Sequence, residues 1–267
     1  MSSFIDPANT LQLRLPDDLA ASVGEALDRA RDERWVERLH DRDASLWSAD
    51  PAVQASIVGS LGWLAAPDHF RDQVPALEGF GDGIREAGFS GAVVMGMGGS
   101  SLAAEVLATT FGGSVDYPRV QVLDSTHPAA VARIVDGLDP LATLWIVASK
   151  SGRTVESLAY QADTRFRVEA ALRRQGADES PDQLMIAITD PGKSEEAIPH
   201  HEEFREVFLN PVDIGGRYSA LSYPGLVPAA IAGVDLDALL ASAGQALAGS
   251  RELEPTRNAP VVLGVAL

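Results

Sequence analysis

The sequence predicts an α/β protein: a doubly wound, mostly parallel sheet of five strands preceded by an added N-terminal helical layer. Five short apolar runs occur after residue 89, and the segments between the early runs have helical composition. Strands and helices that alternate in this way imply parallel strands joined by right-handed crossovers. The runs are Ala92–Met95, Val120–Leu123, Leu144–Ala148, Met185–Ile188 and Val207–Leu209, and the helical segments are Ser101–Thr110, Ala129–Leu138 and Val155–Gln175.

The first 88 residues have the periodicity and the caps of helices instead. Leu19, Val23 and Leu27 recur at helical spacing, and Asp50-Pro51 combines an N-cap residue with a proline at the first helical position. We expect three tryptophans to anchor this layer in the core: Trp35, Trp47 and Trp63. The predicted organisation is a helical layer over residues 1–88, a sheet domain over 89–240 and a helical connection over 241–267.

The composition indicates a globular protein and limits the classes of partner. Apolar residues make up 46% of the 267 positions, which is enough to bury a sizeable core. The formal charge is −17 with no run of Lys or Arg, so we expect no nucleic-acid partner, because nucleic acids are bound by basic faces. The lack of cysteine excludes disulfides and thiolate catalysis. With neither a signal peptide nor a long apolar run, we expect a cytoplasmic protein without a membrane partner.

A glycine-rich loop follows the first predicted strand, at Gly96-Met97-Gly98-Gly99-Ser100-Ser101. Glycines allow positive φ and let a ligand approach the main chain closely. The amides at the start of the following helix would then face a bound anion. A tight strand-to-helix turn is the alternative explanation.

The same loop partly matches a dinucleotide-binding fingerprint. The spacing Gly96-x-Gly98-x-x-Ser101 lacks the third glycine, whereas Asp124 ends the second strand near the place of a ribose-binding acid. Asp124 equally fits a cap for the turn into the next helix. A nicotinamide-dependent oxidoreductase is therefore the third-ranked functional hypothesis.

A second loop with anion-binding residues follows the third strand, at Ser149-Lys150-Ser151-Gly152-Arg153-Thr154. Its hydroxyls and amides would donate hydrogen bonds to a phosphate monoester, and Lys150 would supply a compact charge. The alternative is a helix cap formed by Ser151 or Thr154, with Lys150 in solvent. Because ligands bind beyond the carboxyl ends of parallel strands, the two loops together indicate a phosphate site.

Two more loops follow the fourth and fifth strands. Asp190-Pro191-Gly192-Lys193-Ser194 resembles the end of a P-loop but lacks the first glycine, so we interpret it as a turn and helix cap. In Gly215-Gly216-Arg217 the glycines suggest a backbone path that brings Arg217 against a ligand. A guanidinium there could stabilise a developing oxyanion, and a surface salt bridge is an equally good explanation.

Three of these segments together resemble the phosphoglucose isomerase family, in particular the form fused to transaldolase in some bacteria. The segments are Gly96–Ser100, Ser149–Thr154 and Gly215–Ser219, and their order and their placement after strands match that family. The similarity extends over roughly residues 50–267. The resemblance implies a sugar-isomerase (SIS) domain over residues 89–240 that binds glucose 6-phosphate or fructose 6-phosphate and uses no cofactor or metal.

The resemblance also implies roles for individual residues. Arg217 matches the arginine that stabilises the enediolate intermediate, so it is the catalytic candidate. Gly216 and Glu156 are expected behind the residues that contact the substrate, with Glu156 placed to orient Lys150. Arg153 stands where a small residue or a threonine is usual, which departs from the family pattern. The residues expected to hold the substrate are Gly99, Ser100, Ser149, Lys150, Ser151 and Thr154.

The resemblance implies that the chain is a portion of a glucose-6-phosphate isomerase, an aldose–ketose isomerase. In the family the carboxylate base lies in a second SIS subdomain, and no segment of this chain matches its glutamate. We expect the apolar run from Pro260 to Leu267 to begin that subdomain, and the fragment to be inactive alone. We also expect a homo-oligomer at full length. A non-catalytic sugar-phosphate-sensing SIS module is the alternative function.

Overall fold

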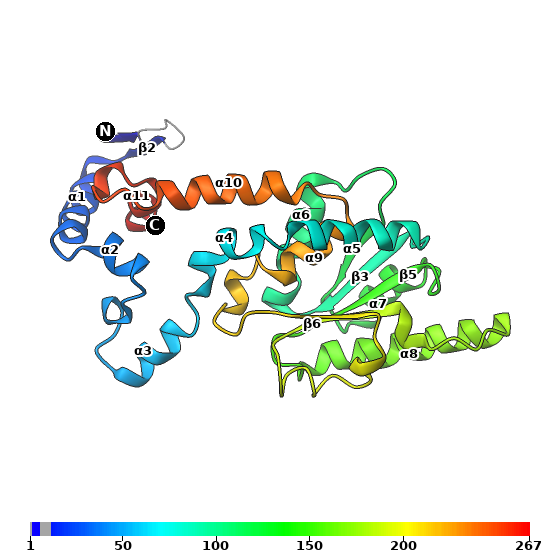
Figure 1. Ribbon diagram of the computed structural model, residues 1–267. Coiled ribbons are helices and arrows are strands. Elements are labelled where there is room, and N and C mark those ends of the chain that lie inside the picture. The colour runs from blue at the N-terminus through cyan, green and yellow to red at the C-terminus, as the bar shows by residue number, and fades with distance from the viewer. Residues whose placement is uncertain (1, 6–11) are drawn as a thin grey trace. The chain divides into compact units, whose positions relative to one another are not determined.

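The computed structural model describes residues 2–5 and 12–267 (Figure 1). Contacts divide the chain into two compact units, one made of Met1–Pro67 with Ala241–Leu267 and the other of Asp68–Leu240. These units differ from the three predicted segments 1–88, 89–240 and 241–267. The reason is packing: α5 (Val74–Glu86) contacts α9 (Tyr223–Ile231) in the second unit, whereas α11 (Ala259–Ala266) contacts α1 (Asp17–Asp32) in the first.

The second unit contains the predicted parallel sheet. Three of its strands, β3, β5 and β6, are buried along their whole length, which explains why they are continuous apolar runs. The strands are β3 (Gly91–Gly96), β4 (Arg119–Leu123), β5 (Thr143–Ala148), β6 (Met185–Thr189) and β7 (Glu206–Leu209). Their order is β4-β3-β5-β6-β7, and each neighbouring pair is parallel. The predicted fold class is therefore confirmed.

Helices cover both faces of this sheet (Figure 1). The connecting helices are α6 (Leu102–Phe111), α7 (Pro128–Val135) and α8 (Val155–Gln175), close to their predicted bounds. On one face, Met95 and Trp145 of the sheet share a core cluster with Val135 of α7 and Val168 of α8. The side chains that alternate with them point to the opposite face, where α9 contacts β3.

The order of the strands creates a switch point between β3 and β5. From β3 the chain crosses to β4 on one side, and it then returns past β3 to β5 on the other side. The loops that leave the carboxyl ends of β3 and β5 therefore diverge, and this is where doubly wound sheets bind ligands. Both predicted anion-binding loops start at this point.

The first unit is mainly helical, but it begins with two strands that the sequence analysis did not predict. β1 (Ser2–Ile5) and β2 (Gln12–Leu15) pair antiparallel. The helical expectation was wrong for these residues because Gln12–Leu15 alternates polar and apolar residues, which is a strand pattern. In α1, Val23 and Leu27 are buried as predicted, and they share an apolar cluster with Val262 of α11.

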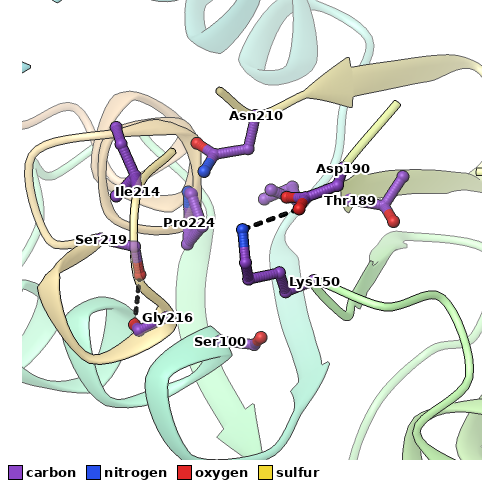
Figure 2. Close-up of a pocket in the computed structure, with 10 residues that line it drawn as sticks. Ser100, Lys150, Thr189, Asp190, Asn210, Ile214, Gly216, Ser219 and Pro224 are labelled. Atoms are coloured by element: carbon purple, nitrogen blue, oxygen red, sulfur yellow. Dashed lines mark hydrogen bonds and ion pairs between the residues drawn. The ribbon is translucent and has the colours of Figure 1, made fainter. Parts of the chain in front are cut away.

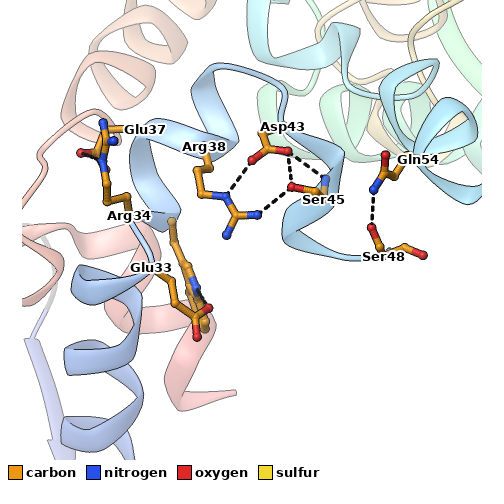
Figure 3. Close-up of polar contacts among 9 residues, drawn as sticks. Glu33, Arg34, Glu37, Arg38, Asp43, Ser45, Ser48 and Gln54 are labelled. Atoms are coloured by element: carbon orange, nitrogen blue, oxygen red, sulfur yellow. Dashed lines mark hydrogen bonds and ion pairs between the residues drawn. The ribbon is translucent and has the colours of Figure 1, made fainter. Parts of the chain in front are cut away.

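Polar contacts join the short helices that follow α1 (Figure 3). Arg38 of α2 (Trp35–His40) donates to Asp43 Oδ2 at 2.7 Å and to Ser45 Oγ at 3.0 Å in the 3₁₀ helix η1 (Ala44–Leu46). Hydrogen bonds from Ser45 and then from Arg38 lower the pKa of Asp43 to about 2. Asp43 therefore stays ionised near neutral pH and links the two helices.

The prediction that three tryptophans anchor this layer was wrong for Trp47, because that residue is 49% exposed. Trp35 and Trp63 are half-buried. Asp50 accepts a hydrogen bond from Ala52 N and caps α3 (Pro51–Val58) as predicted, yet no residue of α3 is buried. The remaining helices are α4 (Ala66–Arg71), α10 (Leu236–Gly249) and the 3₁₀ helices η2 (Gly62–Ala65), η3 (Gly98–Ser100), η4 (Pro181–Leu184), η5 (His201–Glu203), η6 (Gly216–Tyr218) and η7 (Pro255–Arg257). Among the helices described, none is long and apolar enough to cross a membrane.

The close packing of α5 on α9 predicts that Gly81→Ala destabilises the second unit. A Cβ at Gly81 would lie 2.3 Å from the carbonyl oxygen of Ala230, so the two helices would have to separate. Overpacking of this kind costs about 1–3 kcal/mol of unfolding free energy. The matched control is Gly79→Ala in the same helix, where a Cβ meets nothing within 4 Å. That control should raise the unfolding free energy by about 0.5–1 kcal/mol, because alanine is the better helix former. Chemical denaturation of both variants measures the difference, and equal effects would contradict the packing argument.

Candidate functional site

A small pocket lies at the carboxyl edge of the sheet in the second unit (Figure 2). Its cavity measures ≈ 10 Å³, which is room for about one water-sized group. The loops after β3, β5, β6 and β7 all contribute to its wall. The lining residues are Ser100, Lys150, Ile188, Thr189, Asp190, Asn210, Ile214, Gly216, Ser219 and Pro224.

The glycine-rich loop after β3 is held against the loop that carries Arg217. A Cβ at Gly99 would lie 2.1 Å from the carbonyl oxygen of Gly216, so only glycine allows this approach. Ser219 Oγ donates to Gly216 O at 2.7 Å and also lies 3.3 Å from Gly99 O. Gly98 has φ +56°, the left-handed conformation that glycine adopts easily. The glycines thus have a packing role, and they bring Ser100 to the pocket wall.

The loop after β5 presents hydroxyl groups at the start of α8. Ser149 is buried, and its Oγ lies 2.9 Å from Thr154 Oγ1. Thr154 immediately precedes α8 but its side chain caps no amide, so the capping alternative is wrong for this residue. Ser151 Oγ accepts from Arg153 N at 3.2 Å, inside the loop itself. The first amides of α8 therefore receive no cap from the side chain of Thr154, and a helix start of this kind suits an anion.

Gly152 fixes the shape of this loop. Its φ is +64°, and a Cβ there would lie 1.7 Å from the carbonyl oxygen of Ser194. Any other residue would push the loop away from the segment that follows β6. The exposed side chain of Arg153 comes next, at the position where the sequence departs from the family pattern.

Lys150 forms an ion pair that the sequence analysis did not predict. Its Nζ donates to Asp190 Oδ2 at 2.7 Å and to Val212 O at 3.1 Å, so Lys150 is paired, although part of its side chain remains in contact with solvent. The expectation that Glu156 orients Lys150 is wrong, because Asp190 makes that contact. Glu156 lies near Tyr160, whose pKa is raised by burial and then by the negative charges of Asp124 and Glu156.

Asp190 was missed because its segment was interpreted as a turn and helix cap. No α-helix follows it: turns occupy the next residues, up to the short 3₁₀ helix η5. The side chain is 13% exposed, and its burial raises the pKa of the carboxyl group, although Lys150 acts in the opposite direction. The sequence did contain an indication of this role. Asp190 directly follows a buried strand, and that strand neighbours the one that leads to Lys150.

Arg217 lies in η6 with its side chain exposed. Within residues 2–5 and 12–267, no hydrogen bond or ion pair engages its guanidinium, so the salt-bridge alternative does not account for it. Neither Gly215 nor Gly216 has a positive φ, so the predicted backbone path does not depend on that conformation. Gly99 instead packs closely against the carbonyl of Gly216. The described residues also contain no cluster of three or more side chains suited to a metal ion.

Comparison with known proteins agrees with this arrangement. The family model for phosphoglucose isomerase matches residues 65–267. A glucose-6-phosphate isomerase of Thermus thermophilus is 34% identical over 210 residues, which cover 75% of this chain and 44% of that protein. The enzyme of the same name from Rubrobacter xylanophilus is 31% identical over 235 residues, covering 81% and 51%. The chain thus spans about half the length of these relatives.

Solved structures show the same fold. A hypothetical protein from Thermus thermophilus is 30% identical, with a TM-score of 0.67 over 94% of this chain and 57% of that chain. The glucose-6-phosphate isomerase of Chlamydia trachomatis has the same TM-score over 95% of this chain and 50% of that chain, at 23% identity, and supports the fold alone. The family model covers more than half of the chain, and its match includes every loop of the site. The chain therefore belongs to the phosphoglucose isomerase family.

Proposed function

We propose that this chain forms the sugar-phosphate-binding part of a glucose-6-phosphate isomerase, which interconverts glucose 6-phosphate and fructose 6-phosphate through an enediolate. The observation that carries the proposal is the convergence of three loops at one edge of the sheet, in a chain whose relatives are glucose-6-phosphate isomerases. Because the chain spans about half of those relatives, the activity belongs to the complete protein. The proposal also includes a homo-oligomeric, cytoplasmic enzyme.

The phosphate group of the substrate is assigned to the loop after β5. Ser149, Ser151 and Thr154 offer hydroxyl donors there, and the 21-residue helix α8 begins directly behind them. The positive end of the helix dipole and its free amides favour a dianion at this position. The glycine-rich loop completes the site with Gly99 and Ser100, and Lys150 contacts another part of the substrate.

Arg217 is assigned to the stabilisation of the enediolate. An exposed guanidinium without a competing partner stays charged, and it can hydrogen-bond an oxyanion that develops during the reaction. Gly216 and Glu156 support the site without contacting the reacting atoms. Proton transfer between C2 and C1 needs a carboxylate base within hydrogen-bond reach, and we assign that base to a part of the protein outside these loops.

Ligand binding to this chain should depend on the phosphate group. Fructose 6-phosphate at 100 times its Kd should raise the unfolding free energy by about 2.7 kcal/mol, whereas glucose should leave it unchanged. Thermal melts with fructose 6-phosphate, glucose and NAD make the comparison. A shift from glucose equal to that from the sugar phosphate would argue against the proposal, as would a larger shift from NAD.

Thr154→Val should weaken the binding of fructose 6-phosphate. The change keeps the shape of the side chain but removes a hydroxyl assigned to the phosphate, and such a bond to a charged group is worth about 1.5–3 kcal/mol. The expected loss of affinity is about 10- to 150-fold, measured by calorimetric titration. Thr110→Val, on the exposed surface of α6, is the matched control and should bind normally. Equal affinity in the two variants would remove Thr154 from the site.

Arg217→Ala should slow catalysis more than it weakens binding. In isomerase assays on the complete protein, kcat should fall by about 10²- to 10³-fold, because the enediolate loses its charged donor. KM should change much less, since Arg217 acts mainly on the transition state. Arg119→Ala removes an exposed arginine at the amino end of β4, on the opposite edge of the sheet, and serves as the control. A change confined to KM would make Arg217 a binding residue instead.

A further inference from the structure

Three polar residues lie side by side where the parallel pairing of β5, β6 and β7 continues past the ends of the strands. Ser149 N donates to Ile188 O at 3.0 Å, and Asp190 N donates to Lys150 O at 3.3 Å. On the other side of β6, Asn210 N donates to Thr189 O at 2.8 Å. The register therefore places Lys150, Asp190 and Asn210 in adjacent positions, and we refer to them as the Lys150–Asp190–Asn210 row.

The side chains of the row point into the pocket at this edge of the sheet (Figure 2). Lys150 uses two donor bonds, to Asp190 Oδ2 and Val212 O, and an ammonium has three hydrogens to donate. Asp190 Oδ1 and Asn210 Oδ1 are both buried and accept no hydrogen bond from any described residue. Asn210 is only 4% exposed, so these oxygens cannot be satisfied by open solvent. The row thus offers the third hydrogen of Lys150 and the second hydrogen of Asn210 Nδ2 as donors and two oxygens as acceptors. The buried, unpartnered hydroxyl of Thr189 lines the same pocket.

This combination does not suit a phosphate. The ammonium of Lys150 is already paired with a carboxylate, and the two buried, unpartnered oxygens of the row would face the acceptor oxygens of a dianion. None of the hydroxyls assigned to the phosphate bonds to Lys150 Nζ: Ser149 pairs with Thr154, and Ser151 accepts from Arg153 N. The side chains of the row and the hydroxyls assigned to the phosphate are therefore separate groups, although Lys150 lies in the same loop as Ser149 and Ser151.

A hydroxyl group matches the row. Its oxygen accepts from Lys150 Nζ while its hydrogen is donated to Asp190 Oδ1 or Asn210 Oδ1. The cavity of ≈ 10 Å³ has room for one such group but not for a sugar ring. Ser100 and Gly216 line the same cavity, so the group would lie between the glycine-rich loop and the loop that carries Arg217.

We propose that the Lys150–Asp190–Asn210 row binds a single hydroxyl of the sugar portion of a phosphorylated sugar, with Asp190 as the residue that positions Lys150. The inference rests on the proposed function, because it takes the phosphate to be bound at the start of α8. By binding this hydroxyl, the row would distinguish a sugar phosphate from other phosphate monoesters.

The test compares two ligands that share a phosphate monoester, fructose 6-phosphate and methyl phosphate, the second of which has no hydroxyl on its carbon. Kd values for both come from ligand-dependent shifts in Tm, which remain measurable for weak ligands at high concentration. The ratio of the Kd for methyl phosphate to that for fructose 6-phosphate reports the contribution of the sugar. General electrostatic changes cancel in this ratio, since both ligands carry the same charged group.

Asp190→Asn and Lys150→Met should each lower this ratio about tenfold or more, because the first releases Lys150 from its position and the second removes the charged donor of the hydroxyl. In the double variant, the ratio should lie within about twofold of the ratio for Lys150→Met alone. Effects of this kind are expected for residues that act as a unit. Asp124→Asn removes an exposed carboxylate that follows β4 at the same edge and should leave the ratio unchanged. Lys150 is 39% exposed, so its replacement keeps the test decisive even if Asp190→Asn fails to fold.

Other outcomes would overturn the inference. If Lys150→Met weakened both ligands equally, Lys150 would be a phosphate ligand and the row would not recognise a hydroxyl. If Asp190→Asn left the ratio unchanged while Lys150→Met lowered it, Asp190 would not position Lys150. If the unaltered chain bound neither ligand, the proposed function itself would fail, whereas normal binding with an unchanged ratio in every variant would reject the row alone.

Discussion

The parallel pairing of the strands is the constraint on which the whole site depends. In a parallel ladder, residues that follow two neighbouring strands come out at the same edge, whatever their separation in sequence. Lys150 and Asp190 are brought together in this way from positions 40 residues apart, and Asn210 adjoins them through β7. β5 and β6 are buried along their whole length, so a slip in register would disturb close packing on both faces and would also place different residues at the edge.

Close backbone contacts then fix the loops that the sheet has brought together. Gly99 lies against Gly216 and Gly152 against Ser194, at separations that leave no room for a Cβ. These contacts join segments that are far apart in the chain, and each joins a loop assigned to the substrate with a neighbouring loop. The glycines thus give the site its rigidity as well as its access to a ligand, and rigid placement of polar groups is what a binding site for a small metabolite requires.

Charge is distributed unevenly over the site. Lys150 is paired with Asp190, whereas the side chain of Arg217 is exposed and engages no partner among the residues described. A paired ammonium is held in one place and exerts a weaker net field, which suits recognition of a neutral hydroxyl. A free guanidinium keeps its full charge for an anion. In the proposed site, two cations can therefore serve different groups of one ligand, which the sequence alone would not distinguish.

The sequence by itself determined the sheet, the helices that connect its strands and the two loops at its switch point. Continuous apolar runs, helical composition and glycine-rich strand ends are local properties, and they predicted β3 to β7 and α6 to α8 closely. The sequence also placed Ser149, Lys150 and Arg217 after strands, where ligands bind. It did not reveal β1 and β2 or the exposure of Trp47, since burial depends on what packs against a side chain and not on its type.

Only the tertiary structure decided which side chains meet. The sequence assigned the orientation of Lys150 to Glu156, six residues away, and interpreted Asp190 as a turn residue. The partner was Asp190 because hydrogen bonding between β5 and β6 overrides proximity along the chain. The buried, unpartnered oxygens of Asp190 and Asn210 likewise arise from two strands that the sequence separates. Long-range register is a property of the folded sheet, and no local pattern encodes it.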